Sequence, residues 1–212
     1  MKALLLWPIM PNSFWSYQET LDMANLRVTN PPLGLITVAA LLPPTWELRF
    51  CDRNVRPETD ADWAWCDIVI ISAMVIQQQD FRQLIHKGLA LGKKVAVGGP
   101  YPTSYPEVAL EAGAQYLILD EGELTIPLFL QALDRGDSQG IFRATEKPDV
   151  TQTPLARYDL LDLDAYLAVT VQFSRGCPFQ CEFCDIINLY GRKPRTKTPA
   201  QMLHEFETLY NF

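Results

Sequence analysis

The chain has 212 residues, of which 48% are hydrophobic, and its formal net charge is -7 at neutral pH. This length predicts one full domain and part of a second, and the acidic balance argues against a nucleic-acid partner. No apolar run is long enough to predict a transmembrane segment. The short apolar start, Ala3–Trp7, predicts a first buried strand rather than a signal peptide.

Residues 1–135 alternate apolar strands with helical patterns. Strands are expected over Ala3–Trp7, Trp46–Cys51, Asp67–Ser72, Lys94–Val97 and Tyr116–Leu119. Helices are expected over Leu33–Leu42, Gln78–Leu91 and Glu123–Arg135, the last two with an apolar stripe. Ser104, with Glu107 three residues later, predicts a capping box at a further short helix. This alternation predicts an α/β domain, a doubly wound parallel sheet in the flavodoxin-like order, with a ligand at the carboxyl ends of the strands.

The loops after the predicted strands carry candidate ligand contacts. The first loop, Pro8–Thr29, is long and rich in aromatic residues and methionine, as a cover for a large flat ligand would be. Adjacent glycines after the fourth strand would let a ligand approach the backbone closely. The candidate contacts are Ser72, Met74, Gly98, Gly99, Pro100, Thr103, Glu121 and Gly122. Ordinary turn chemistry explains each loop equally well when the loop is taken alone.

The C-terminal part changes in character. Residues 136–165 are polar and punctuated by proline, which predicts a linker. A strand over Ala168–Phe173 is expected to run into a cysteine loop, and a helix capped by Thr198 to follow it, with Leu203, Phe206 and Tyr210 on one face. Residues 166–212 would then form the first βα unit of a barrel, with the loop at the end where barrels place their chemistry.

Three cysteines in that loop, Cys177, Cys181 and Cys184, have the spacing C-x3-C-x2-C, and no further cysteine follows them. They can hold three corners of a four-iron, four-sulfur (4Fe-4S) cluster and leave one iron open to a small molecule, whereas electron-transfer clusters have four Cys ligands. The alternatives are a zinc site completed by His204 or reduced cysteines in a core. Cys51 and Cys66 are expected to be core residues of a protein in a reducing, cytoplasmic compartment.

The cysteine loop resembles the signature of radical S-adenosylmethionine (SAM) enzymes. The resemblance implies that SAM chelates the open iron, with Phe183 beside the adenine. One injected electron, from a donor such as flavodoxin or ferredoxin, would then yield a deoxyadenosyl radical. The resemblance assigns no catalytic side chain.

The first domain, placed before this motif, resembles the cobalamin-binding (B12-binding) domain of B12-dependent radical SAM enzymes. The resemblance rests on Pro31–Leu35 and on the Gly-Gly-Pro-x-Pro-Thr loop at 98–103, and it makes the strand-end contacts named above cobalamin contacts. One departure matters: the chain lacks the Asp-x-His-x-x-Gly motif whose His binds cobalt, and its two histidines are His86 and His204. We therefore expect no protein His beneath the cobalt.

The branch that includes the hopanoid C-2 methylase matches best, on Cys184–Ile187 and Tyr190–Lys197. The resemblance implies methyl transfer from methylcobalamin to an unactivated carbon of a small, lipid-like substrate. Other radical SAM chemistry, such as cyclisation or oxidation, is an alternative, and so is a non-catalytic fragment that binds cobalamin or a cluster. We expect an incomplete barrel, because only one βα unit follows the linker and a full barrel takes about 250 residues.

Overall fold

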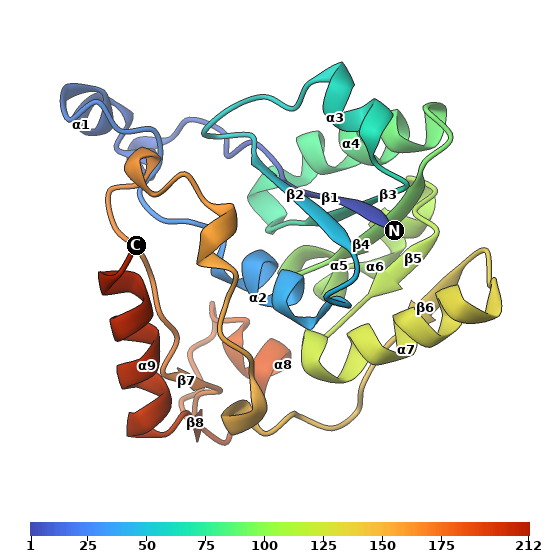
Figure 1. The fold of residues 1–212 in the computed structure, drawn as a ribbon. Coiled ribbons are helices and arrows are strands. Elements are labelled where there is room, and N and C mark those ends of the chain that lie inside the picture. The colour runs from blue at the N-terminus through green and yellow to red at the C-terminus, as the bar shows by residue number, and fades with distance from the viewer.

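A computed structural model describes residues 1–212. Its centre is a six-stranded parallel sheet in the order β2-β1-β3-β4-β5-β6 (Figure 1). The strands are β1 Lys2–Trp7, β2 Glu47–Asp52, β3 Ile68–Ser72, β4 Lys94–Gly98, β5 Tyr116–Ile118 and β6 Gly140–Phe142. This order confirms the predicted doubly wound α/β sheet.

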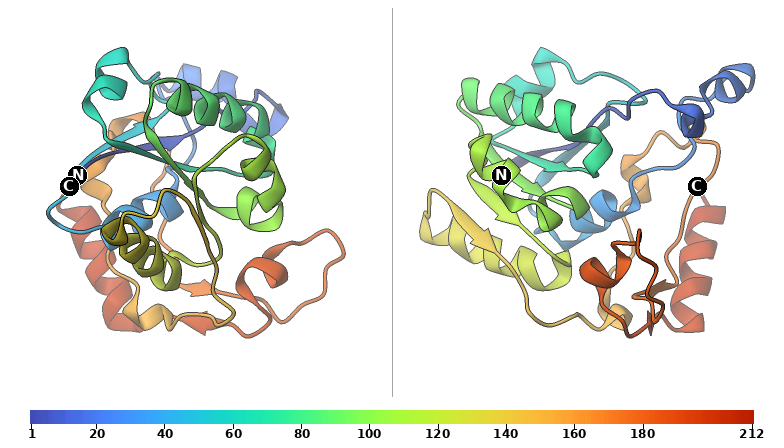
Figure 2. Two further views of the ribbon diagram at one scale, coloured as in Figure 1. Left: turned by 90° about the vertical axis from the view of Figure 1, so that its right-hand side faces the viewer. Right: turned by 180° about the vertical axis from the view of Figure 1, so that it is seen from behind.

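Helices cover both faces of the sheet (Figure 2). The helices are α1 Gln18–Met23, α2 Leu33–Leu41, α3 Asp60–Trp65, α4 Gln78–Ala90, α5 Pro100–Ser104, α6 Pro106–Glu111, α7 Gly122–Arg135, α8 Ile186–Tyr190 and α9 Pro199–Tyr210. Helices α2 and α7 pack on one face, and α3 to α6 pack on the other. None of the helices combines the length and apolar character that crossing a bilayer would require.

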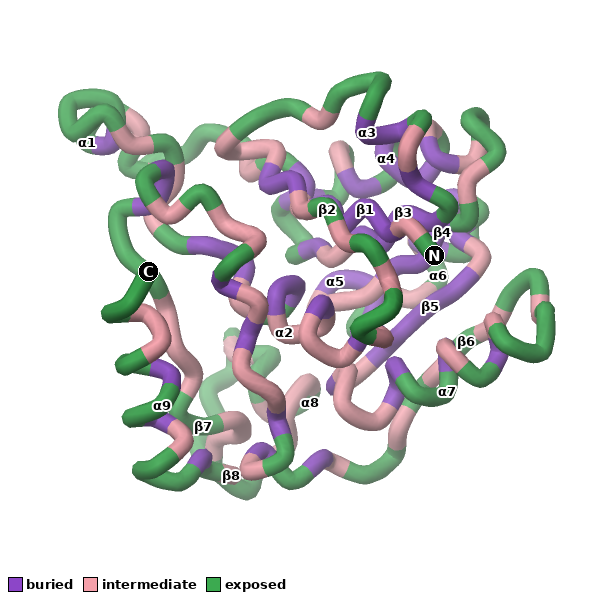
Figure 3. The backbone as a smooth tube through the Cα atoms, in the orientation of Figure 1, coloured by how far each residue is buried: buried purple, intermediate pink, exposed green.

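Alternate residues of each strand supply two separate cores. In β1, Leu4 and Leu6 belong to the core beneath α3 to α6, while Ala3 and Leu5 belong to the core beneath α2 and α7. All four are fully buried, and the central strands form the buried interior of the molecule (Figure 3). Burial on both faces explains why these strands read as continuous aliphatic runs rather than as alternating patterns.

The segment 136–165 contains more regular structure than a linker. Strand β6 extends the sheet beyond β5, with Ile118 opposite Phe142. Further along, Tyr158 is buried against Ile36 of α2, and the Ala165 carbonyl accepts hydrogen bonds from the amides of Arg27 and Val28. Strand β6 has only three residues, Gly140–Phe142, at the edge of the sheet, which is too short for the apolar run that predicts central strands, so the sequence pattern did not predict it.

The predicted strand over Ala168–Phe173 is wrong. This segment has no strand beside it, and strand β7 covers only Ser174–Arg175, which pairs antiparallel with β8, Arg195–Thr196. The Ala168 amide donates to the Thr29 carbonyl and the Phe173 carbonyl accepts from the Lys197 amide, but no continuous ladder of backbone hydrogen bonds joins these two ends, so the segment does not form a strand of a sheet. The first βα unit of a barrel therefore stays a prediction: after residue 166 the structure has the cysteine loop and helix α9 but not the expected strand.

Helix α9 confirms its predicted start, since Thr198 and Gln201 form a capping box. Its predicted apolar face is exposed, however: Leu203, Phe206 and Tyr210 face outward, while Met202 and Glu205 are buried.

The capping box at Ser104 is also wrong. Helix α6 begins at Pro106, so its N-cap position is held by Tyr105 rather than by Ser104, and no side chain caps it. Ser104 instead ends α5, and its hydroxyl donates to the Asp185 carboxylate at 2.7 Å.

Candidate ligand site

The carboxyl ends of the parallel strands meet at one edge of the sheet, where two cavities open. The strand order reverses between β1 and β3, and α/β sheets bind ligands in the crevice that such a reversal creates. One cavity has a volume of about 190 Å³ and the other about 860 Å³. They share six lining residues, which are Leu33, Gly34, Leu35, Ser72, Pro100 and Tyr190.

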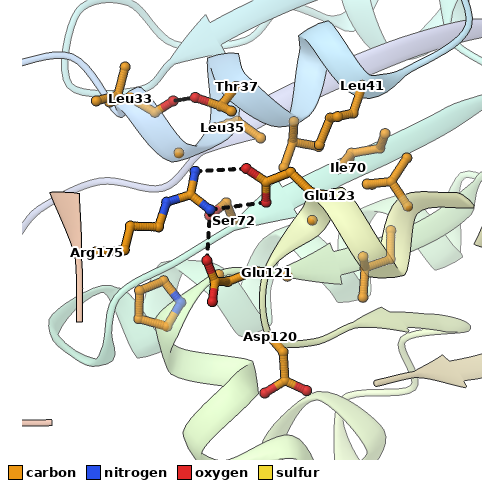
Figure 4. A pocket seen from close by; sticks show the side chains of 18 of the residues that line it. Leu33, Leu35, Thr37, Leu41, Ile70, Ser72, Asp120, Glu121, Glu123 and Arg175 are labelled. Atoms are coloured by element: carbon orange, nitrogen blue, oxygen red, sulfur yellow. Dashed lines mark hydrogen bonds and ion pairs between the residues drawn. The ribbon is translucent and has the colours of Figure 1, made fainter. Parts of the chain in front are cut away.

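The smaller cavity lies between α2 and α7, over the ends of β3, β4 and β5 (Figure 4). Apolar side chains of the helices, among them Val38, Leu41 and Ile126, form its sides. Polar groups converge at its mouth from Ser72, Glu121 and Glu123, whereas the Asp120 carboxylate points away from them (Figure 4). An apolar wall with a few convergent polar groups is the usual composition of a small-molecule site.

Gly99 shapes the turn between β4 and α5 at this cavity. Its φ is +91° and its ψ is -177°, a conformation that is close to exclusive to glycine. A Cβ there would collide with the Ser72 hydroxyl and lie 3.1 Å from the Ala73 amide nitrogen. The turn therefore needs a residue without a side chain, which leaves backbone exposed where a ligand approaches.

The larger cavity lies between the sheet edge and the long first loop. Its wall includes Trp7 at the end of β1, Met10 and Trp15 from the loop, and Arg53 and Asn54 after β2. Asn54 ties the loop to the sheet, because it accepts a 2.6 Å hydrogen bond from the Met10 amide and donates to the Pro8 carbonyl at 3.1 Å. The volume of this cavity falls in the range of about 300–1,000 Å³ that ligand pockets occupy.

A buried ionic network lies beside the smaller cavity, and Glu121, Glu123 and Arg175 of this network line it. Nη1 of Arg175 donates to Glu121 at 2.8 Å and to Glu123 at 3.0 Å, and Nη2 of Arg195 pairs with the other Glu121 oxygen at 2.7 Å. The Glu121 side chain is only 3% exposed. Burial opposes ionisation of Glu123, yet hydrogen bonds from Arg175 and Thr153 outweigh it and hold the pKa of Glu123 below its usual value.

The cysteine loop begins directly after this network. Cys177, Cys181 and Cys184 are all free thiols and are at least partly exposed. Gly176 has a φ of +90°, and a Cβ there would lie 2.5 Å from the Lys193 carbonyl oxygen, so the loop can start against 191–193 only with glycine. Three thiols on one loop are the donor type of iron–sulfur clusters, but the chain gathers no group of three or more His, Cys, Asp or Glu side chains that could hold a metal ion.

Most of the predicted strand-end contacts line these cavities. Ser72 and Pro100 line both, Met74 lines the larger one, and Gly98, Gly99, Glu121 and Gly122 line the smaller one.

Thr103 lies outside both cavities. It is buried, and its hydroxyl accepts a 3.0 Å hydrogen bond from the Asp120 amide, which holds Asp120 at a φ of +63°. Phe183 is 93% exposed and contacts no cavity. Both histidines are exposed and line neither cavity.

Sequence patterns assigned no role to Arg175, Glu123 or Tyr190, all of which line the smaller cavity. The nearest signal was the Glu-Gly-Glu pattern at the start of α7, which places two carboxylates beside a helix N-terminus. Nothing in the spacing showed that an arginine more than fifty residues later would complete the pair.

Comparison with known proteins decides the family. Residues 19–130 match the model of the B12 binding domain, a span that contains β2 to β5 and most of the cavity lining. The chain belongs to the B12-binding domain family. Its sheet order and its strand-end cavities agree with that assignment.

Several relatives of this B12-binding chain have names that state methyl transfer. It is 60% identical, over 99% of its length, to an uncharacterized methyltransferase of Synechocystis sp., and it covers 39% of that protein. It is 36% identical, over 98% of its length, to the hopanoid C-2 methylase of Rhodopseudomonas palustris, and covers 40% of it. It is 25% identical, over 88% of its length, to the bacteriochlorophyllide d C-12(1)-methyltransferase of Chlorobaculum tepidum. The chain thus spans about two fifths of the length of the first two relatives.

Proposed function

We propose that the chain binds cobalamin across the two adjoining cavities and serves a SAM-dependent methyl transfer to a small, lipid-like molecule. The observation that carries this proposal is the pair of adjoining cavities, with six lining residues in common, at the switch point of a B12-binding sheet. The names of the methyltransferase relatives support the reaction class. The 36% identity to a hopanoid methylase supports the substrate class.

The residues of the edge fit a large, mostly neutral ligand. Gly99 leaves backbone open to close approach, Ser72 offers a hydroxyl, and Trp7 and Trp15 offer flat apolar surface. In this proposal these side chains bind and orient the cofactor, and α2 and α7 exclude water from its buried part. No side chain is expected to ligate cobalt, because neither cavity contains a His.

The proposal assigns the cluster to Cys177, Cys181 and Cys184, and a SAM contact to Phe183. When bound, these groups would supply one-electron chemistry and a methyl donor, and a flavodoxin or ferredoxin would supply the electron. All three thiols are at least partly exposed, and closure of such a loop round iron is ordinary because metal binding is coupled to folding.

Titration with methylcobalamin in the dark tests the cofactor assignment. Trp7 and Trp15 line the larger cavity, so binding should quench tryptophan fluorescence. The variant Met74→Trp, at the rim of that cavity, should add a quenched signal, whereas Leu110→Trp, exposed on α6, should add an unquenched one. Absence of saturable binding by the folded chain would refute the assignment, as would a protein-nitrogen signal on cob(II)alamin in EPR spectra.

Anaerobic reconstitution with iron and sulfide tests the cluster. About four irons per chain are expected, as a 4Fe-4S cluster requires. Cys181→Ala should abolish incorporation, while Cys66→Ala, which changes a buried thiol outside the loop, should retain it. Tight zinc that iron cannot displace would overturn the cluster without touching the cobalamin assignment.

A further inference from the structure

Both ends of the cysteine loop form the outer wall of the smaller cavity. Gln172 and Arg175 precede the cysteines and Tyr190 follows them, and all three line that cavity. Tyr190 also lines the larger cavity. The loop therefore stands on the wall of the candidate ligand site rather than on a separate surface, and Arg175 reaches into that site (Figure 4).

Arg175 is the residue that fixes this wall to the sheet domain. Its Nε donates to Gln172 at 2.7 Å, its Nη1 donates to Glu121 and Glu123, and its Nη2 lies 2.8 Å from Glu123. A guanidinium has five N–H donors, so these four interactions nearly exhaust its capacity. The Arg175 side chain is 9% exposed and has few N–H groups left to donate to a ligand. Its geometry is that of a residue that holds the cysteine loop against the sheet domain.

The two stems of the loop are also joined to each other. The Cys177 amide donates to the Gly191 carbonyl at 3.0 Å, and Arg195 donates both to the Tyr190 carbonyl and to Glu121. Glu121 thus receives an arginine from each stem, Arg175 before the cysteines and Arg195 after them. A ligand that moves Glu121 or the cavity wall must therefore move both stems of the cysteine loop.

We propose that Arg175 is a positioning residue that sets where the cysteine loop stands relative to the ligand in the cavity. This inference rests on the proposed cobalamin site and adds a coupling to it. Occupancy of the cavity changes the accessibility of the cysteines through Arg175, and the effect is reciprocal because binding free energies are linked. The methyl-transfer proposal itself does not require such a coupling.

The test measures alkylation of the thiols by iodoacetamide in the full chain before iron loading. Peptide mass spectrometry follows Cys177, Cys181 and Cys184, with buried Cys66 as an internal reference. Methylcobalamin, held in the dark, should slow alkylation in the loop by roughly fivefold or more, the lower end of common coupling strengths. Arg175→Gln should still bind methylcobalamin, by tryptophan quenching, but should lose most of this protection.

Arg135→Gln is the matched control, because it removes one arginine from an exposed ion pair with Asp137 far from the cavities. It should behave like the unaltered chain. If Arg175→Gln fails to fold, Arg175→Lys replaces it, since lysine keeps the charge but has no planar fork, and the same loss of protection is expected.

Each remaining outcome counts against the inference. Protection that persists in the Arg175 variant would remove its positioning role. Binding without protection in the unaltered chain would remove the coupling. Loss of methylcobalamin binding in the variant would make Arg175 a ligand contact instead. Failure of the unaltered chain to bind methylcobalamin would refute the cobalamin proposal, a result separate from the other three, and the coupling would fall with it.

Discussion

Among Gly→Ala replacements at the ligand edge, Gly99→Ala should lower the free energy of unfolding the most. The residue adopts a φ of +91° with a ψ of -177°. Forcing a non-glycine residue into this region costs about 1–3 kcal/mol. The added Cβ would also collide with the Ser72 hydroxyl and lie 3.1 and 3.2 Å from the amide nitrogen and carbonyl oxygen of Ala73. Overpacking of this kind costs about 1–3 kcal/mol more, so the free energy of unfolding should fall by about 2–6 kcal/mol.

Two other glycines provide graded controls. Gly92 has a φ of +67° but open space where an added methyl group would lie, so Gly92→Ala should cost only the backbone preference of about 1–2 kcal/mol. Gly34 lies in α2 with ordinary helical backbone and nothing within 4 Å of its Cβ position, so Gly34→Ala should stabilise by about 0.5–1 kcal/mol. Ser72→Ala combined with Gly99→Ala should recover the part of the loss that the hydroxyl causes.

Urea unfolding followed by far-UV circular dichroism measures these differences as shifts of the midpoint at constant slope. The expected order of stability is Gly34→Ala, the unaltered chain, Gly92→Ala and Gly99→Ala. A Gly99→Ala protein as stable as Gly92→Ala would show that the β4–α5 turn relaxes easily, and the argument that this turn is a rigid part of the ligand edge would be wrong.

Three further predictions concern the C-terminal segment and the sheet domain. Because the pKa of Glu123 is lowered on folding, its contribution to stability is present above its ordinary value of 4.5 and is lost as pH falls through the lower folded value. The urea midpoint should therefore fall on acidification through this range, and Glu123→Gln should flatten that pH profile. Glu-C protease should cut first after Glu146, which is exposed between β6 and the buried Val150, and initial cleavage inside residues 1–135 would contradict the fold. Thr59→Ala removes the α3 capping box with Asp62 and should lower the urea midpoint by the equivalent of about 1 kcal/mol, while Thr45→Ala, in a turn outside the helices, serves as its control.

The sheet domain could be predicted because its strands are long, aliphatic and separated by amphipathic helices. Burial of both faces leaves a signal in the sequence itself, and Ile68–Ser72 carries it plainly. Strand β6 could not be predicted in this way, because only its pairing with β5 makes Gly140–Phe142 a strand. The error over Ala168–Phe173 has the same origin: a β pattern needs a partner strand, and sequence periodicity does not say whether one lies alongside.

The strand-end loops were predictable as a ligand site because parallel topology brings their ends together whatever their spacing in sequence. Ser72, Gly98, Gly99 and Glu121 duly meet at one cavity. Arg175 could not be predicted, since its partners lie 52 and 54 residues away and only the folded chain brings them within hydrogen-bond distance. Thr103 shows the opposite error: it was predicted as a ligand contact because it lies in a strand-end loop, but its hydroxyl instead accepts a hydrogen bond from the Asp120 amide.

The position of Glu121 and Glu123 explains why Arg175 can hold the cysteine loop at the ligand edge without being indispensable for the fold. Both carboxylates lie at the start of α7, where the unpaired amides and the helix dipole favour negative charge by about 0.3–1 kcal/mol each. Glu121 keeps Arg195 when Arg175 is lost, and Glu123 keeps the Thr153 hydroxyl at 2.7 Å. Removal of Arg175 therefore leaves each carboxylate with a partner, in contrast to the isolated buried charge that normally makes such a loss severe. Arg175 alone connects the start of α7 to the chain two residues before Cys177. Its loss should therefore change the position of the cysteine loop more than the free energy of unfolding.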